Sequence, residues 1–189
     1  MASAVIAKRP STQIRRSSIG APKSRYYWLA YRWDNLLLSC GFCNKKKLNQ
    51  FPLEDEAKRA LDHHMRLDDE VPAILKPDGN FDLRIHIKFE GDRPEGLTDP
   101  GRDTIKVLGL DSPKHSGRAR HLAEIKLEYA AYVLNISSTD PEKRRRAEVA
   151  RRLIEEAALP DKPYSAMAAA YLMANRLPEA PAETAGNAV

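Results

Sequence analysis

The chain has 189 residues, a length that fits one compact domain or one domain with a small appendage. Hydrophobic residues make up 42% and charged residues 30%, as in soluble globular proteins, and no apolar run reaches the ~20 residues of a transmembrane helix. Two cysteines exclude a fold built on disulfides, and the formal net charge of +5 favours a polyanionic partner.

The positive charge is concentrated near the N-terminus. Residues 1–33 contain seven lysine and arginine residues and no acidic residue, so the rest of the chain carries a net charge of −2. We expect residues 1–21 to form a disordered, mostly extended basic arm, because they are rich in Ser, Arg and Pro and lack apolar periodicity. An organelle transit peptide is an alternative, although Pro10 interrupts the helix that it would need. No apolar stretch suits a secretory signal.

Order is expected to begin at Tyr26. Five aromatic residues lie close together, and we expect them to form core and scaffold rather than a surface for stacking nucleobases: Tyr26, Tyr27, Trp28, Tyr31 and Trp33. Residues 54–67 predict a helix, since acidic residues begin the segment and good helix formers continue it to a point before Pro72. Residues 82–90 predict a half-buried strand by strict alternation, and a loop rich in Gly, Pro and Asp follows over 91–101.

The rest of the chain is expected to be helical. Gly109 is expected to end a short helix, and Asp140 before Pro141 is a strong helix-start signal. The predicted helices cover residues 102–110, 116–136, 141–159 and 164–176. The third is expected to bury Ala147, Ala150, Leu153, Ile154 and Ala157. We expect residues 177–189 to be a disordered tail.

The clearest chemical signal is the Cys-x-x-Cys pair of Cys40 and Cys43, the only cysteines of the chain. Such a pair supplies two of the four soft ligands that a tetrahedral zinc site takes. Two ordinary buried cysteines are the alternative interpretation. The pair therefore predicts half of a zinc site.

The sequence around this pair resembles the HNH (ββα-metal) endonuclease family. Residues 35–47 follow the pattern Asn-Leu-x-x-x-Cys-x-x-Cys-Asn-x-x-Lys. Tyr-Tyr-Trp-Leu-Ala-Tyr at 26–31 and Asn-Gln-Phe-Pro-Leu at 49–53 narrow the resemblance to the Septu-type and retron-associated bacterial HNH proteins, which are found beside AAA-type ATPases in anti-phage defence operons. The resemblance extends from about residue 22 to the last helix.

This resemblance implies an α+β, mainly helical fold, with an HNH-like motif region over 22–100 and a helical region over 101–176. It also implies a hairpin and a helix that hold a divalent cation, Mg²⁺, Mn²⁺ or Zn²⁺, for hydrolysis of DNA phosphodiester bonds. Asn35 matches the residue that pins the intervening loop, and Asn44 matches the metal ligand on the helix. Cys40 and Cys43 match the structural zinc knuckle. The expected DNA contacts are Lys23, Arg25, Lys45, Lys46 and Lys47, the last three near the start of the following helix.

The chain departs from the family pattern in its first motif. The family carries a general-base histidine shortly before Pro-Lys-Ser, and Ile19 stands at that position ahead of Pro22-Lys23-Ser24. The earlier Cys-x-x-Cys of the family is missing too, since no cysteine precedes Cys40. We hypothesise that one event, a frameshift, a misplaced start or a truncation, removed both. Reading the upstream DNA in its other frames tests this hypothesis.

Other residues offer further interpretations. His63 or His64 could complete the zinc site, or both could be solvated residues of a charged helix. His115 and His121 are expected on a polar face without a special role. The basic run over 143–146 is expected to be a solvated helix face.

The leading interpretation is a metal-dependent HNH-type endonuclease that cuts DNA in anti-phage defence, with an open question whether this copy is truncated or inactive. The alternative is a non-catalytic subunit that retains the fold and binds nucleic acid or a protein partner. RNA as a substrate stays open. The resemblance implies an AAA-type ATPase partner, and the oligomeric state is left open. We expect no membrane association, and the cysteine usage and lack of sorting signals favour the cytoplasm.

Overall fold

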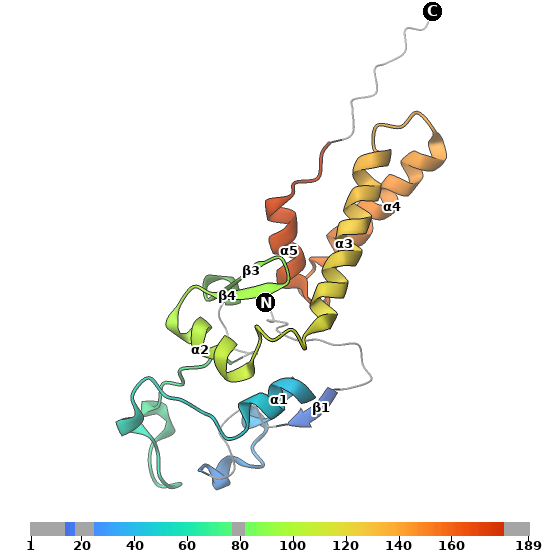
Figure 1. Ribbon diagram of the computed structural model, residues 1–189. Coiled ribbons are helices and arrows are strands. Elements are labelled where there is room, and N and C mark those ends of the chain that lie inside the picture. The colour runs from blue at the N-terminus through green and yellow to red at the C-terminus, as the bar shows by residue number, and fades with distance from the viewer. Residues whose placement is uncertain (1–13, 18–24, 77–81, 180–189) are drawn as a thin grey trace, which may run out of the picture.

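The computed structural model describes residues 14–17, 25–76 and 82–179. The α-helices are α1 (Gly41–Lys47), α2 (Asp99–Leu108), α3 (Ser116–Asn135), α4 (Pro141–Ala157) and α5 (Ser165–Ala174). The strands pair antiparallel, β1 (Ile14–Ser17) with β2 (Leu37–Cys40) and β3 (Ile87–Glu90) with β4 (Arg93–Gly96). These elements confirm the α+β, mainly helical fold class. Figure 1 shows β1 and α1 in the lower part of the molecule and the α3–α4 hairpin projecting at the top.

The first sheet joins two segments that are separated in the sequence. Ile14 of β1 is opposite Cys40, and Ser17 is opposite Leu37. Part of the segment expected to be a disordered arm, residues 1–21, is therefore a strand, while the rest of that segment lies outside the described residues. Because β2 leads directly into α1, the elements follow one another as strand, strand and helix.

The helix predicted over residues 54–67 is wrong. The segment contains a short 3₁₀ turn over Glu56–Lys58, after which the backbone becomes extended at Arg59. The Arg59 guanidinium donates to the hydroxyl of Tyr26 at 2.7 Å and to the carbonyl oxygen of Phe51 at 2.8 Å. These tertiary hydrogen bonds hold the chain in a conformation that its local helix propensity does not favour.

Only part of the aromatic cluster is core. Tyr26 is fully buried, whereas Tyr27, Tyr31 and Trp33 are exposed. The prediction that these three form core is therefore wrong. The physical reason is that the backbone forms successive 3₁₀ turns here, the first over Tyr27–Leu29, which direct neighbouring side chains to different sides.

Residues 82–90 are not one continuous strand as predicted. The side chain of Asp82 accepts a hydrogen bond from the backbone N–H of Arg84 at 3.0 Å and starts a 3₁₀ turn, which leaves only β3 as strand. Ile85 is consequently exposed rather than on the buried face. The loop predicted over 91–101 is also wrong in part, because it contains β4 and the first turn of α2.

Local signals predicted the C-terminal helices correctly. Gly109 ends α2 in the left-handed region with φ of 60°, a conformation that glycine adopts without strain. The side chain of Asp140 accepts a hydrogen bond from the backbone N–H of Glu142 and caps α4. The helices predicted over 116–136 and 164–176 correspond to α3 and α5.

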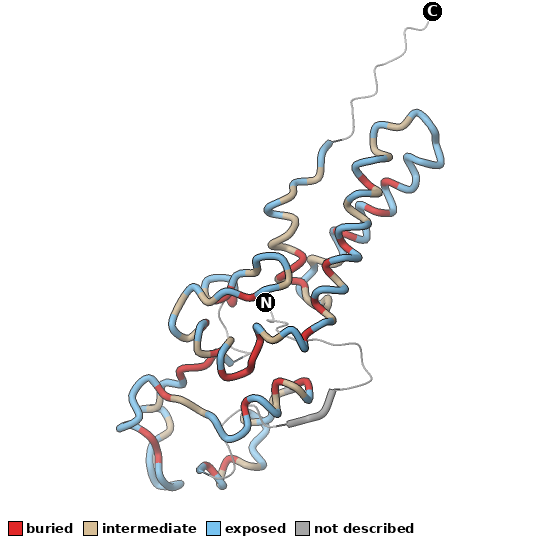
Figure 2. The backbone as a smooth tube through the Cα atoms, viewed as in Figure 1, coloured by how far each residue is buried: buried red, intermediate tan, exposed pale blue. Residues whose placement is uncertain are grey.

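Buried positions concentrate between α3, α4 and α5 and around α2, as Figure 2 shows. The helical cluster consists of Leu122, Ile125, Tyr132, Ala147, Ala150, Ile154, Met167 and Ala168. On α4 the buried residues recur at spacings of three and four, and Leu153, which lies beside that stripe, is exposed rather than buried as predicted. A second cluster surrounds the two cysteines with Ile74, Val107, Leu108 and Leu110. None of the described helices combines the length and apolar character needed to cross a membrane.

Candidate metal centre

The start of α1 brings Cys40 and Cys43 together. Cys40 precedes the first residue of the helix, with an extended backbone, and its Sγ accepts a hydrogen bond from the backbone N–H of Cys43 at 3.3 Å. Both side chains are buried, and the two cysteines are not joined by a disulfide. A hydrogen bond from an N–H group to sulfur stabilises the thiolate, which is the form that binds metal ions.

The third residue of the centre comes from the junction between α2 and α3. Backbone hydrogen bonds from Ser112 to Gly109 and from His115 to Ser112 fold this junction into consecutive tight turns. They place His115, which directly precedes α3, back beside the end of α2. Its imidazole is buried and meets the ring of Phe42 edge-on, with the centroids 4.9 Å apart. The turns and this aromatic contact orient the imidazole toward α1.

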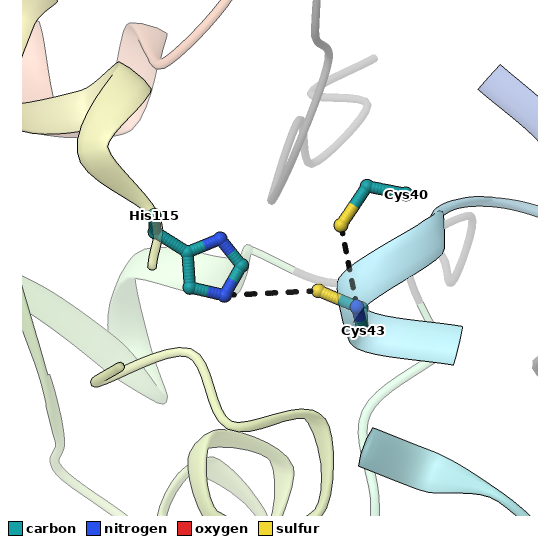
Figure 3. Close-up of side chains that lie close together, drawn as sticks. All are labelled: Cys40, Cys43 and His115. Atoms are coloured by element: carbon teal, nitrogen blue, oxygen red, sulfur yellow. Dashed lines mark hydrogen bonds between the residues drawn. The ribbon is translucent and has the colours of Figure 1, made fainter. Parts of the chain in front are cut away.

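Figure 3 shows the His115 ring pointing toward Cys43, with Cys40 beside it. The Sγ of Cys43 lies 3.9 Å from the Nε2 of His115, and the three ligand atoms all lie within 4.8 Å of one another. The ligand atoms of a tetrahedral zinc ion bound by two thiolates and an imidazole are separated by about 3.6–3.8 Å. Small side-chain rotations would shorten the separations between the three ligand atoms, now up to 4.8 Å, to this range. The three residues therefore fit one metal ion that prefers soft ligands.

The Nε2 atom of His115 also lies 3.1 Å from the carbonyl oxygen of Gly109. Because a carbonyl oxygen only accepts, Nε2 carries the ring proton when this hydrogen bond forms. A metal ion bound at Nε2 would replace the hydrogen bond and require the proton on Nδ1 instead. Metal binding at this site would therefore change the tautomer of His115.

A buried arginine follows His115 in the sequence, and its guanidinium lies over the ring of Phe89, 5.8 Å from the centroid. Arg118 is one turn after His115 in α3, and its side chain donates to the carbonyl oxygen of Leu110. Its Nε atom is buried without a hydrogen-bond partner among the described residues. Burial lowers the pKa of Arg118, and nearby groups, first Asp92 and among the others Cys43, oppose this shift.

Asn35 lies in the loop before β2. Its Nδ2 donates to the carbonyl oxygen of Leu29 at 3.0 Å, which closes the loop between the two residues. Asn35 also lines a cavity of about 620 Å³ together with Arg32 and Asp34. Arg32 and Asp34 form an exposed ion pair at 2.7 Å, and the hydrogen bond from Arg32 lowers the pKa of Asp34. Asn35 therefore holds the loop beside this cavity.

Asn44 is half-buried on α1, directly after Cys43, and lies outside the cavity that Asn35 lines. The structure thus places the two asparagines in different surroundings. It brings Cys40 and Cys43 together as the sequence predicts.

The lysines of α1 differ in their exposure. Lys45 and Lys46 are exposed and lie in the last turn of the helix rather than near its start as expected. Lys47 is only 1% exposed, and burial lowers its pKa to about 8. Its ammonium group is therefore not presented on the surface where we expected a phosphate contact. Arg25 is exposed, and Lys23 lies outside the described residues.

The expectation that His115 lies on a polar face is wrong, because its side chain is buried beside the two cysteines. His63 and His64, which were one option for completing the zinc site, are exposed and stack on each other with ring centroids 3.8 Å apart. His115 is 72 residues from Cys43 and just outside the periodic part of α3, so no local pattern marks it. The available signal was elimination: with no further cysteine in the chain, its five histidines are the first residues to consider as additional zinc ligands.

Comparison with known proteins gives one finding that bears on function. The chain is similar to the Septu protein PtuB of Bacillus mycoides (strain KBAB4), with 37% identity over 108 residues. No family model matches the chain, and no solved structure matches it. The matched region makes up 54% of this chain and 36% of that protein, so the similarity covers about half of the chain and about a third of its relative.

Proposed function

We propose that this protein is a Septu-type anti-phage defence protein with an HNH-type motif that hydrolyses DNA phosphodiester bonds. The observation that carries the proposal is the antiparallel β1–β2 pair that leads directly into α1, with Asn35 closing the loop before β2 and Asn44 on the helix. The 37% identity to the Septu protein PtuB supports the defence role.

In this proposal each polar residue of the motif has a separate task. Asn35 keeps the loop closed through its hydrogen bond to Leu29. Asn44 contributes a ligand to a divalent cation, which when bound stabilises negative charge on the scissile phosphate. The exposed Lys45 and Lys46 contact DNA phosphates, a contribution that weakens as salt concentration rises. Lys47 is left out of this surface because it is buried.

Cys40, Cys43 and His115 are proposed to hold a separate, structural zinc ion. Two thiolates and an imidazole are a soft ligand set, which favours zinc over the hard cations Mg²⁺ and Ca²⁺. The ion would connect α1 with the α2–α3 junction and so fix the position of the helix that carries Asn44.

A non-catalytic subunit is the second candidate function, and Ile19 favours it. Ile19 stands where the resembling family has its general-base histidine, and no histidine among the described residues lines the cavity beside Asn35. Such a subunit would bind DNA or an AAA-type ATPase without cutting. An AAA-type ATPase is the partner class to test by co-purification.

A nicking assay on supercoiled plasmid with Mg²⁺, Mn²⁺ or Zn²⁺ separates the two functions. Hydrolysis predicts metal-dependent nicking that Asn44→Ala abolishes, while the exposed Asn49→Ala serves as the control and keeps wild-type activity. Absence of nicking together with salt-sensitive binding of a labelled duplex supports the non-catalytic subunit. Absence of both nicking and DNA binding contradicts any action on DNA.

A further inference from the structure

The candidate metal centre has three ligands, Cys40, Cys43 and His115. No other cysteine or histidine of the described residues lies close enough to be a fourth ligand. Both cysteines are already used, all five histidines lie within the described residues, and only His115 lies with the cysteines. No carboxylate of the described residues joins this group. Structural zinc sites have four protein ligands, whereas sites with three leave one position for a ligand from outside.

Arg118 indicates the nature of that outside ligand. Its side chain is 95% buried, and its Nε–H has no acceptor among the described residues, although one guanidinium nitrogen donates to Leu110. Asp92 and Asp111 act on Arg118 electrostatically, but neither accepts a hydrogen bond from Nε. A buried cationic N–H without an acceptor is unfavourable. An anion beside it would supply both the acceptor and the opposite charge.

Arg118 and His115 reach the same short stretch of backbone. The imidazole of His115 lies against the carbonyl of Gly109, and the guanidinium of Arg118 binds the carbonyl of the next residue, Leu110. His115 directly precedes α3, and Arg118 lies three positions later, in the first turn of that helix. The two side chains therefore lie against neighbouring peptide groups at the end of α2.

The charges of the centre agree with an anionic ligand. A divalent ion bound by two thiolates and a neutral imidazole forms a group with no net charge. A singly charged anion in the fourth position would give this group one negative charge, which the guanidinium of Arg118 would offset in a buried environment.

We propose that the fourth position of the Cys40–Cys43–His115 centre is exchangeable and binds a small oxyanion, a phosphate or a carboxylate, that accepts a hydrogen bond from Nε of Arg118. This inference rests on the metal centre put forward above but not on DNA hydrolysis. The centre would then be a ligand-binding site as well as a structural connection.

Cobalt substitution tests the inference, because the d–d absorption bands of Co²⁺ report a change of ligand directly. The cobalt-loaded full chain is titrated with inorganic phosphate and, separately, with acetate. We expect saturable band shifts, and the relative affinity of the two anions distinguishes a phosphate from a carboxylate ligand. Arg118→Met is expected to weaken the affinity at least tenfold. Arg120→Met, an exposed position of the same helix, is the matched control and should match the wild type.

The outcomes are distinguishable. Bands that move with neither anion overturn the exchangeable position, and an unchanged affinity in Arg118→Met overturns the role of the arginine. If Arg118→Met fails to bind cobalt, Arg118→Gln takes its place and is expected to show the same loss of anion affinity. Absence of thiolate-to-cobalt bands in the wild type removes the metal centre itself. Plasmid nicking is measured separately, so a failure of the proposed hydrolysis leaves this result intact.

Discussion

Cys43 and His115, which are 72 residues apart in the sequence, face each other with 3.9 Å between Sγ and Nε2. Cys43 belongs to α1, which directly follows β2, and His115 directly precedes the long helix α3. A metal ion between them would connect the N-terminal motif to the helical part of the molecule. The proposed centre is thus a link between distant segments as well as a local brace.

Removing the metal ion is expected to destabilise the protein. A ligand that binds only the folded state adds about 4 kcal/mol to the free energy of unfolding when its concentration is 1,000 times its dissociation constant. Urea unfolding followed by circular dichroism, with zinc or with a chelator, measures this difference. The chelator should have no effect on His115→Ala. An equal chelator effect on that variant would show that zinc binds elsewhere.

The C-terminal helices were predictable because their signals are local. The capping side chain of Asp140 and the left-handed Gly109 act within one helical turn of the residues that they affect. The segment over 54–67 could not be predicted in the same way. Its course depends on hydrogen bonds from Arg59 to Tyr26 and Phe51, which no local pattern contains.

Of the three residues in the candidate site, only Cys40 and Cys43, which lie close together in the sequence, could be predicted. A spacing of three residues brings Cys40 and Cys43 together at the start of one helix, so the sequence alone indicates half of the centre. His115 joins them through the turns after Gly109 and the packing of Phe42, both of which are tertiary features. The same reason applies to Lys47, which is buried and whose Nζ lies 6.0 Å from the ring centroid of Phe51, outside its own helix.

Tyr26→Phe is expected to destabilise the fold by about 1–3 kcal/mol, the cost of leaving buried polar partners unsatisfied. The Tyr26 hydroxyl accepts from Arg59 at 2.7 Å and donates to Glu70 at 2.9 Å, and burial raises the pKa of Tyr26 to about 12. The exposed Tyr27→Phe is the matched control, with an expected change near zero. Urea unfolding of both variants checks this, and equal stabilities would argue against the hydrogen-bonded network.

Gly101→Ala is expected to destabilise the protein by about 1–3 kcal/mol, as other overpacking substitutions do. A Cβ atom at Gly101 would collide with the backbone carbonyl oxygen of His86, which is fixed by the bond that it accepts from Leu97. Gly41→Ala is the control, since a Cβ there meets no atom within 4 Å. Thermal unfolding compares the two, and a Gly101→Ala protein as stable as Gly41→Ala would contradict this packing.

Lys47→Met is expected to stabilise the protein at pH 7 by up to about 3 kcal/mol, because burial holds the pKa of Lys47 near 8 instead of 10.5. Between these two values the unfolded chain binds more protons than the folded chain, so wild-type stability rises with pH across this window. The advantage of the methionine variant should therefore be greatest below pH 8 and shrink toward pH 10.5. Unfolding measured at several pH values tests this, with the exposed Lys45→Met as control; a constant advantage would contradict the lowered pKa.

The zinc content of the purified protein tests the proposed metal centre most directly. We expect one zinc ion per chain in the wild type, much less in Cys43→Ser and His115→Ala, and wild-type content in His63→Ala, an exposed histidine outside the centre. Zinc well below one ion per chain in the wild type, or full retention of zinc in His115→Ala, would contradict the account.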